Sequence, residues 1–319
     1  MMLELVNLSN YGMDTEQLIG NKKEKLEKFL KDNQLDGIEM MFCQSWDKAL
    51  HEEKFIQGVH LNFWPSWLEF WRGDLKSVEE QFGSREAIVQ CYGGLTRKDW
   101  VKRYQENIAV AKQTHAKYFV FHVSHARTSE VFDWNFQASS EEVIDATIEL
   151  VNELVSEIPE DTMVLFENLW WPGLTLLDKQ LVAKLIDNVN HNNVGIMLDT
   201  GHLMNTNQQL KSQEEAVDYV INIVENLGEY RKFIKGVHLH HSLSGEYVLN
   251  SIKKVIRTKP TSGEIMEHIL KIDEHLPFTT AKVKRIIEYI QPEFLVHEFM
   301  QSTREDWQNK LNMQKRALK

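Results

Sequence analysis

The chain has 319 residues, of which 42% are hydrophobic, and a formal net charge of −11. This length can fill one large α/β domain or two modest ones, and the acidic balance disfavours the broad basic face that is typical of nucleic-acid-binding proteins. No apolar run approaches the roughly 18–20 residues needed to cross a bilayer, so we expect no membrane insertion. The chain has two cysteines, Cys43 and Cys91, and does not begin with a basic and then apolar leader. It is therefore predicted to be cytoplasmic and free of disulfides.

Eight short apolar runs, rich in β-branched and aromatic residues, predict eight β-strands. In chain order they are LELVNL (3–8), DGIEMM (36–41), GVHLNF (58–63), YFVFHVSH (118–125), MVLFENL (163–169), VGIMLDTGH (194–202), KGVHLHH (235–241) and FLVHEF (294–299). Amphipathic stretches around residues 26–30, 100–111, 143–151, 217–224 and 283–290 predict helices between them. Strand and helix are thus expected to alternate throughout. Eight such units favour a (β/α)8 TIM barrel whose active site lies at the C-terminal ends of the strands.

Two longer connections, 64–117 and 242–293, interrupt this alternation within one predicted domain that spans residues 1–319. The first begins with WPSWLEFWRGD, whose aromatic residues form either a lid over a bound ring or buried helix packing. The second contains the polar stretch IRTKPTSGE (256–264), followed by IDEHLPFTTA (272–281). The residues after Gln301 are expected to form a closing helix.

Six of the predicted strands carry, at or near their C-terminal end, a residue that can bind a divalent metal ion: His60, His122, Glu167, Asp199, His238 and Glu298. In a barrel these ends meet at one mouth. Glu167, Asp199, His238 and Glu298 together suit one Mn²⁺, Mg²⁺ or Zn²⁺ with open positions for substrate oxygens. The alternative is a set of structural buried charges, which would need lysines or arginines at neighbouring strand ends, and the sequence offers none there.

The chain contains more potential ligands than one ion needs. The motif D-T-G-H pairs Asp199 with His202, and D-E-H places Asp273 and His275 on one side of an extended segment. With His60 and His122, nine residues could hold three ions, with Glu167 bridging two of them. Three zinc ions would suit phosphoester hydrolysis, whereas one metal ion would suit an isomerase.

These motifs resemble the xylose isomerase-like TIM barrels, a family that includes endonuclease IV, the ketose epimerases and the sugar-phosphate isomerases. FHVSH is similar to the fourth-strand FHPGSH of endonuclease IV, DTGH to its sixth-strand D-T-x-H, VHLHH to its seventh-strand M-H-L-N-D, and D-E-H to its D-x-H. His60 matches the third-strand histidine, the Glu167–Asn168 pair the fifth-strand glutamate motif, and Glu298 the eighth-strand glutamate. The resemblance covers nearly the whole chain, and it implies nine metal ligands: His60, His122, Glu167, Asp199, His202, His238, Asp273, His275 and Glu298.

The chain also departs from the two branches of that family. Endonuclease IV follows D-x-H with a glycine-rich loop, whereas this chain has the segment 276–280, which disfavours nucleic acid as a partner without excluding it. His240 and His241 replace the N-D of the seventh-strand motif. The arginine that often follows the seventh-strand histidine in the epimerases has no clear match.

Five further residues are expected to contact substrate: Glu39, Trp64, His125, Asn168 and His240. The structural alternatives are a buried lysine pair for Glu39, helix packing for Trp64 and a structural hydrogen bond for His125. His297 should point away from Glu298 and serve packing or a hydrogen bond behind the site. The remaining histidines of helical or turn context, His51, His115, His191 and His268, are expected at the surface.

The sequence thus predicts a divalent-metal-dependent isomerase or epimerase that acts on a small sugar or sugar phosphate. Glu167 and Glu298 would exchange a proton on opposite faces of a carbon beside a polarised carbonyl. The alternative is a trinuclear zinc phosphoester hydrolase of the endonuclease IV type. A barrel that binds a sugar or a protein without turnover is a third possibility, although no ligand is lost. One to three zinc or manganese ions per chain are expected, and the substrate and oligomeric state stay open.

Overall fold

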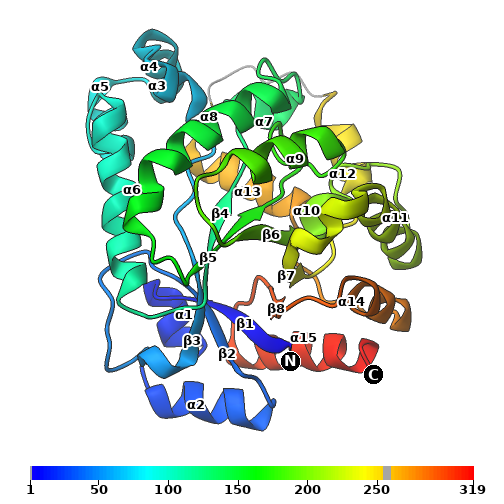
Figure 1. Ribbon diagram of the computed structural model, residues 1–319. Coiled ribbons are helices and arrows are strands. Elements are labelled where there is room, and N and C mark those ends of the chain that lie inside the picture. Colours follow the sequence, from blue (N-terminus) through cyan, green and yellow to red (C-terminus); the bar gives the residue numbers. More distant parts are fainter. Residues whose placement is uncertain (1, 254–259) are drawn as a thin grey trace.

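The computed structural model describes residues 2–253 and 260–319. Its eight strands pair in parallel and in chain order, and β8 pairs with β1 to close a barrel that the helices surround (Figure 1). The strands are β1 (Leu3–Ser9), β2 (Gly37–Met41), β3 (Ile56–His60), β4 (Tyr118–His122), β5 (Met163–Glu167), β6 (Val194–Asp199), β7 (Ile234–Leu239) and β8 (Phe294–His297). The predicted (β/α)8 barrel is therefore confirmed.

The helices occupy the connections between strands and the C-terminal end of the chain. The α-helices are α1 (Gly12–Gln17), α2 (Lys23–Asp32), α3 (Leu68–Arg72), α4 (Leu75–Phe82), α5 (Arg85–Tyr92), α6 (Arg97–Lys112), α7 (Glu130–Asp133), α8 (Ser140–Leu154), α9 (Lys179–Asn188), α10 (Thr200–Met204), α11 (Gln213–Asn226), α12 (Gly245–Ser251), α13 (Ser262–Ile272), α14 (Lys284–Ile290) and α15 (Arg304–Ala317). Short 3₁₀ helices are η1 (Glu53–Phe55), η2 (Val155–Glu157), η3 (Gly228–Phe233) and η4 (Ala281–Val283). In the described parts of the chain, no helix is long and apolar enough to cross a membrane.

The expected strict alternation of strand and helix is wrong between β2 and β3. There the chain forms a loop and then the single turn η1. The side chain of Asp47 accepts hydrogen bonds from the backbone N–H groups of Ala49 and Leu50, and its carbonyl accepts from the N–H of His51. An aspartate that caps its own turn in this way competes with helix formation, and this segment lacks a helical apolar stripe.

Six strands, β3 to β8, end earlier than the apolar runs that predicted them. The ladder between β4 and β5 ends with the pair His122 and Glu167, and the ladder between β6 and β7 ends with Asp199 and His238. After Asp199 the chain turns into α10, because the Asp199 carboxylate accepts the N–H of His202 at 2.6 Å and caps the helix. The potential ligands thus mark the ends of the ladders and lie beside each other on neighbouring strands.

The two long connections carry helices of their own. The first contains α3 to α6, and the second contains α12, α13, η4 and α14. Residues 254–259 of the second, which include part of the polar stretch IRTKPTSGE, lie outside the described residues. The expected closing helix is α15, which docks on α2 where Trp307 stacks on Phe29 with ring centroids 3.9 Å apart.

A small apolar cluster fills the barrel interior, and it includes Tyr118, Val120, Leu165, Met197 and Val296. A much larger apolar layer packs the strands against the helices. Since side chains alternate along a strand, a residue two positions after an interior residue also faces the interior. The interior cluster therefore forms the floor beneath the strand ends.

Candidate metal centre

Six strand-end residues face the barrel interior directly above this floor. His122, Glu167, Asp199 and Glu298 each follow an interior apolar residue by two positions, and His60 and His238 follow Gly58 and Gly236 by two. Period-two alternation and parallel pairing thus bring together side chains that are up to 238 residues apart in the sequence.

The potential ligand atoms fall into four groups, three of which share residues, and within each group they all lie within 4.8 Å of one another. The first group is His60, His122 and Glu167; the second is Glu167, Asp199, His238 and Glu298; the third is His202, His240, Asp273 and His275; the fourth is Glu39, His60 and His238. All nine residues named as ligands by the family resemblance belong to the first three groups. His240 and Glu39 are the two members that the resemblance does not name.

Glu167 joins the first and second groups. Its Oε2 lies 3.0 Å from His60 Nε2 and 3.5 Å from His122 Nε2, whereas its Oε1 lies 3.4 Å from His238 Nδ1. The side chain is fully buried, and burial raises the pKa of a carboxyl group, but the surrounding imidazoles outweigh this and hold the pKa of Glu167 well below its ordinary value. Glu167 is therefore an ionised carboxylate whose two oxygens face different groups, which is the geometry of a bridging ligand.

Backbone carbonyl oxygens orient the rings of two of the histidines, and in both rings Nε2 faces a carboxylate. His60 Nδ1 lies 3.1 Å from the Leu61 carbonyl oxygen, and His202 Nδ1 lies 2.9 Å from the Asn168 carbonyl oxygen. A carbonyl oxygen only accepts, so these contacts assign one proton to Nδ1, and Nε2 is the nitrogen that would bind a cation once its own proton has left. Histidine ligands of metal ions are usually held in this way.

Three buried polar atoms of the second group make no hydrogen bond: Glu167 Oε1, His238 Nδ1 and Glu298 Oε2. They face one another, since His238 Nδ1 lies 3.0 Å from Glu298 Oε2 and 3.4 Å from Glu167 Oε1. A divalent cation would satisfy all three. Carboxylate oxygen and imidazole nitrogen are ordinary ligands of Zn²⁺ and Mn²⁺, so the residues present fit such an ion.

In the described parts of the chain, all cationic partners of Glu167, Asp199, Asp273 and Glu298 are imidazoles. Burial lowers the pKa of His60, but Glu167 outweighs this and raises it to about 9. Burial raises the pKa of Asp273, but His275 and His202 outweigh this and lower it to about 2. Protons on imidazoles thus balance the carboxylates, and cations that bind here would release protons.

Glu39 and Asn168, both expected to contact substrate, have their polar atoms engaged by the protein. Glu39 accepts a hydrogen bond from Tyr118 at 2.7 Å and faces His238, so the alternative of a buried lysine pair is wrong. Asn168 exchanges two hydrogen bonds with the backbone of Asp199, at 2.9 and 3.0 Å. The first contact orients the Glu39 carboxylate, and the other two fix the backbone of Asp199 at the end of β6.

The aromatic residues that follow β3 form buried packing. Trp67, Phe70 and Trp71 are buried around Trp100 of α6. The Trp64 indole N–H donates to the Cys91 carbonyl oxygen at 3.0 Å, and its ring packs on Tyr104. Of the two readings of this cluster, a lid or helix packing, the contacts match helix packing.

His125 and His297 have structural contacts. His125 Nδ1 accepts the backbone N–H groups of Trp67 and Leu68 at 3.1 and 3.2 Å. His297 lies outside the barrel interior, as expected, where Nε2 is 2.8 Å from Glu4 and Nδ1 is 2.8 Å from Gln314. His125 thus ties the connection after β3 to the end of β4.

Two histidines expected at the surface are buried, so that expectation is wrong for them. His51 lies in the turn that Asp47 caps, and His268 of α13 bonds the Val131 carbonyl oxygen and the Tyr247 hydroxyl. The contact of His268 with Val131 joins residues 137 apart, which local sequence context does not reveal.

Two aromatic residues beside the potential ligands were not predicted from the sequence. The Phe63 ring stacks on His122 with centroids 4.4 Å apart, and Trp170 meets His202 edge-on at 5.2 Å. Each follows a ligand-bearing strand by three residues, which is the signal that could have identified them. Each ring therefore packs against a potential ligand of the site.

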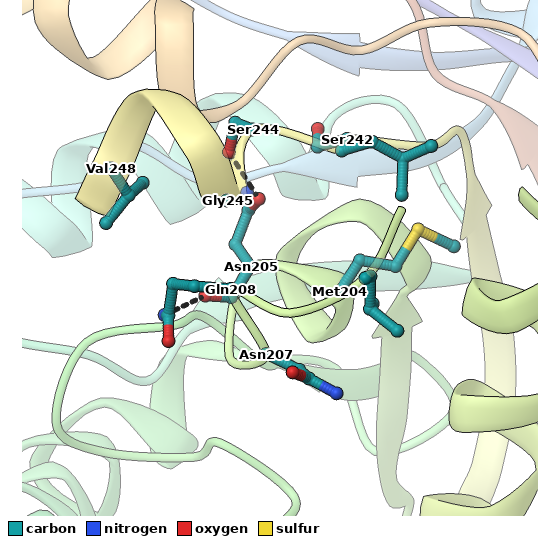
Figure 2. Close-up of a pocket in the computed structure, with 10 residues that line it drawn as sticks. Met204, Asn205, Asn207, Gln208, Ser242, Ser244, Gly245 and Val248 are labelled. Carbon is teal, nitrogen blue, oxygen red and sulfur yellow. Dashed lines mark hydrogen bonds between the residues drawn. The ribbon is translucent and has the colours of Figure 1, made fainter. Parts of the chain in front are cut away.

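A small pocket lies beside the third group. Asn205, Gln208, Ser242 and Ser244 line it with Met204 and Val248, and the Ser244 hydroxyl faces Asn205 (Figure 2). Ser242 Oγ lies 3.4 Å from Asp273 Oδ1, which connects the pocket wall to that group. Its empty volume is about 200 Å³.

The chain belongs to the xylose isomerase-like TIM barrel family, whose profile matches residues 27–290. Among solved structures it is similar to a D-tagatose 3-epimerase-like protein, with 17% identity, a TM-score of 0.56 and coverage of 99% of this chain and 97% of that one. It is also similar to endonuclease IV from Thermus thermophilus, with 12% identity, a TM-score of 0.55 and coverage of 99% of this chain and 98% of that one. A D-psicose 3-epimerase is similar as well, with 12% identity, a TM-score of 0.52 and coverage of 99% of this chain and 97% of that one. At such identities these likenesses show the fold and leave the reaction open. No curated protein sequence matches the chain.

Proposed function

We propose that this protein is a divalent-metal-dependent phosphoester hydrolase with a three-ion centre. The observation that carries the proposal is the presence of three groups of buried ligands, of which only the second is needed by a one-ion isomerase. The first and third groups add His60, His122, His202, Asp273 and His275, and the groups meet through Glu167 and through the 4.0 Å approach of His275 to Glu298. This reverses the order of the two functions that the sequence alone favours.

Bound ions would supply a hydroxide nucleophile at neutral pH and would neutralise charge on the attacking and leaving oxygens. The residues of the chain would hold that centre rigid. Glu167 would keep the first and second groups at a fixed separation, and backbone carbonyls behind His60 and His202 would keep their Nε2 lone pairs aimed inward. Phe63 and Trp170 would exclude water from one side, which strengthens electrostatic interactions within the site.

The second candidate is the isomerase or epimerase on a small sugar or sugar phosphate. It is favoured by the second group, which alone could orient a carbonyl and a hydroxyl while Glu167 and Glu298 move a proton. The net charge of −11 and the purely imidazole partners of the carboxylates also favour an uncharged substrate over DNA. Glu298 is the most exposed of the four carboxylates, at 13% of its side chain, so it is the one best placed to meet substrate.

Ion content and two variants separate these functions. The protein would be purified without chelators, loaded with Zn²⁺ or Mn²⁺, and assayed with phosphomonoesters, phosphodiesters and abasic-site DNA, and with ketoses in D₂O. A hydrolase should bind roughly three ions per chain, and His60→Ala and Asp273→Ala should each abolish phosphate release. One ion per chain, with deuterium exchange into a ketose that survives both variants but not Glu298→Gln, would instead establish the isomerase.

A further inference from the structure

Glu39 of β2 lies in the barrel interior, and its carboxylate reaches His238 of β7. In the strand ladders Glu39 is the partner of Gly58, and Gly58 is the partner of Tyr118. The three residues form one row across β2, β3 and β4. A glycine in the middle of this row leaves its neighbours free to meet above it.

Tyr118 occupies the space above Gly58. A Cβ atom added to Gly58 would lie 2.1 Å from Cζ of the Tyr118 ring, so no larger residue fits without moving the ring. The Tyr118 hydroxyl crosses the row and donates to Glu39 Oε2 at 2.7 Å. Both side chains are buried, so this hydrogen bond is shielded from solvent. The row thus holds the Glu39 carboxylate in one orientation.

His238 connects this carboxylate to the second group. Its Nε2 lies 3.0 Å from Glu39 Oε1 and 3.1 Å from Oε2, while its Nδ1 lies 3.0 Å from Glu298 Oε2. The ring is fully buried, and Nδ1 makes no hydrogen bond. A carboxylate only accepts, so the proton shared with Glu39 resides on Nε2, and Nδ1 is the nitrogen that would bind an ion of the second group once its own proton has left.

We propose that Glu39 and Tyr118 are positioning residues that hold His238 in the orientation and tautomer required of a metal ligand. The inference rests on the proposed function in that the second group binds a divalent ion. Glu39 makes the imidazole a stronger ligand by accepting its Nε2 proton, and Tyr118 holds the carboxylate in line. Neither residue contacts substrate, which replaces the expectation that Glu39 binds a substrate hydroxyl.

A second buried pair in the molecule shows what such a carboxylate does where no ion is expected. Glu69 Oε2 lies 3.4 Å from His125 Nε2, but His125 Nδ1 accepts two backbone N–H groups. The Nδ1 lone pair of His125 is thus engaged by the backbone and cannot bind an ion. His238 differs because its second nitrogen, Nδ1, faces three carboxylates instead of backbone N–H groups.

The test compares Glu39→Gln with Glu69→Gln in the full-length protein. Glutamine has the size of glutamate but can present an N–H group to His238, which would move the imidazole proton to Nδ1 and block the ligand. Zinc bound per chain would be measured during chelator competition, with unfolding followed in parallel. Glu39→Gln should weaken one ion by about 10- to 100-fold, the usual effect of losing a partner behind a ligand, and should leave the other ions in place.

Glu69→Gln is the matched control, because it also removes a buried carboxylate beside a histidine; it should lower stability and leave zinc binding unchanged. Tyr118→Phe should weaken the same ion as Glu39→Gln by a smaller factor of about 3- to 10-fold, since one hydrogen bond to a charged group is lost. In ¹⁵N-histidine spectra of the zinc-loaded wild type, His238 should carry its proton on Nε2.

Three outcomes would overturn the inference. Unchanged zinc affinity in Glu39→Gln would show that His238 needs no partner. A fourth ion in the wild type that Glu39→Gln removes would make Glu39 a direct ligand, with His60 and His238. A wild-type chain that binds no divalent ion would overturn both this inference and the proposed function, whereas the first two outcomes leave the proposed function intact.

Discussion

The mouth of the barrel and the aromatic connection after β3, residues 64–104, both contain residues that can contact a ligand. In the aromatic connection, the indole N–H groups of Trp64 and Trp67 donate to backbone carbonyls of Cys91 and Ser124, and the rings pack around Trp100. At the mouth, a carboxylate oxygen of Glu167 and another of Glu298 face only imidazole nitrogens, and none of their partners is a backbone group. The chemistry of a residue therefore shows what it can bind, while the position of its strand or helix decides whether it is free to bind.

The largest effect that separates these regions is expected from Glu167→Ala. This change removes the carboxylate shared by the first and second groups. Ion affinity in both groups should fall by more than about 100-fold, because even the partners behind metal ligands contribute 10- to 100-fold, and activity should be lost. Elemental analysis after dialysis checks the prediction, and a variant that retains all its ions would remove Glu167 from the proposed centre.

Trp100→Ala should have the converse effect. Trp100 is buried and meets the rings of Trp64, Trp67, Phe70 and Trp71. Truncation of a buried aromatic side chain costs about 3–5 kcal/mol of the free energy of unfolding, whereas the ion content should not change. Denaturant unfolding and elemental analysis would measure the two quantities, and a loss of ions without a loss of stability would assign the aromatic connection to the site.

The two regions should also respond to opposite ends of the pH scale in metal-free protein. His60 has a pKa of about 9 in the fold against 6.5 ordinarily, so its contribution to stability is complete below pH 6.5 and is lost as the pH rises through 9. Burial raises the pKa of Glu69, but His125 and Arg127 outweigh this and lower it to about 2 from 4.5. Its contribution is complete above pH 4.5 and is lost as the pH falls through 2.

Urea unfolding of the wild type, His60→Gln and Glu69→Gln at several pH values would test these signs. The stability difference between wild type and His60→Gln should shrink from pH 6.5 to 9, and that between wild type and Glu69→Gln should shrink from pH 4.5 to 2. A metal ion that displaces the His60 proton should bind more tightly as the pH rises over the same upper range. If the differences in the free energy of unfolding do not vary with pH, folding does not shift the pKa of either His60 or Glu69.

The fold could be predicted because its signals are local. Each strand is an apolar run, and the ligand-type residue lies where the run ends, so the period of two along a strand was enough to aim Glu167 and Asp199 at one mouth. The absence of an α-helix between β2 and β3 was not predicted, because strand and helix alternate in the other connections. The turn that Asp47 caps is itself local, but its signal is a single residue.

The contacts around Glu39 could not be predicted in the same way. Its partner His238 is 199 residues away, and the two meet only because the barrel closes and places β2 across from β7. The route of Tyr118 over Gly58 depends on the register between β2, β3 and β4, which one sequence does not specify. The burial of His268 against Val131, 137 residues away, has the same origin. Local patterns therefore predict candidate ligands better than they predict what holds those ligands in place.

Trp64→Phe is the smallest change that still separates the two regions. Phenylalanine keeps a ring against Tyr104 but removes the hydrogen bond to the Cys91 carbonyl oxygen. The expected loss is about 1 kcal/mol in the free energy of unfolding, the usual contribution of one hydrogen bond, with unchanged ion binding and an unchanged KM. A KM that rises several-fold while stability stays constant would instead place Trp64 against the substrate, as the sequence alone suggested. Phe63→Leu is the matched comparison, since Phe63 stacks on His122 and its loss should alter ion binding rather than stability alone.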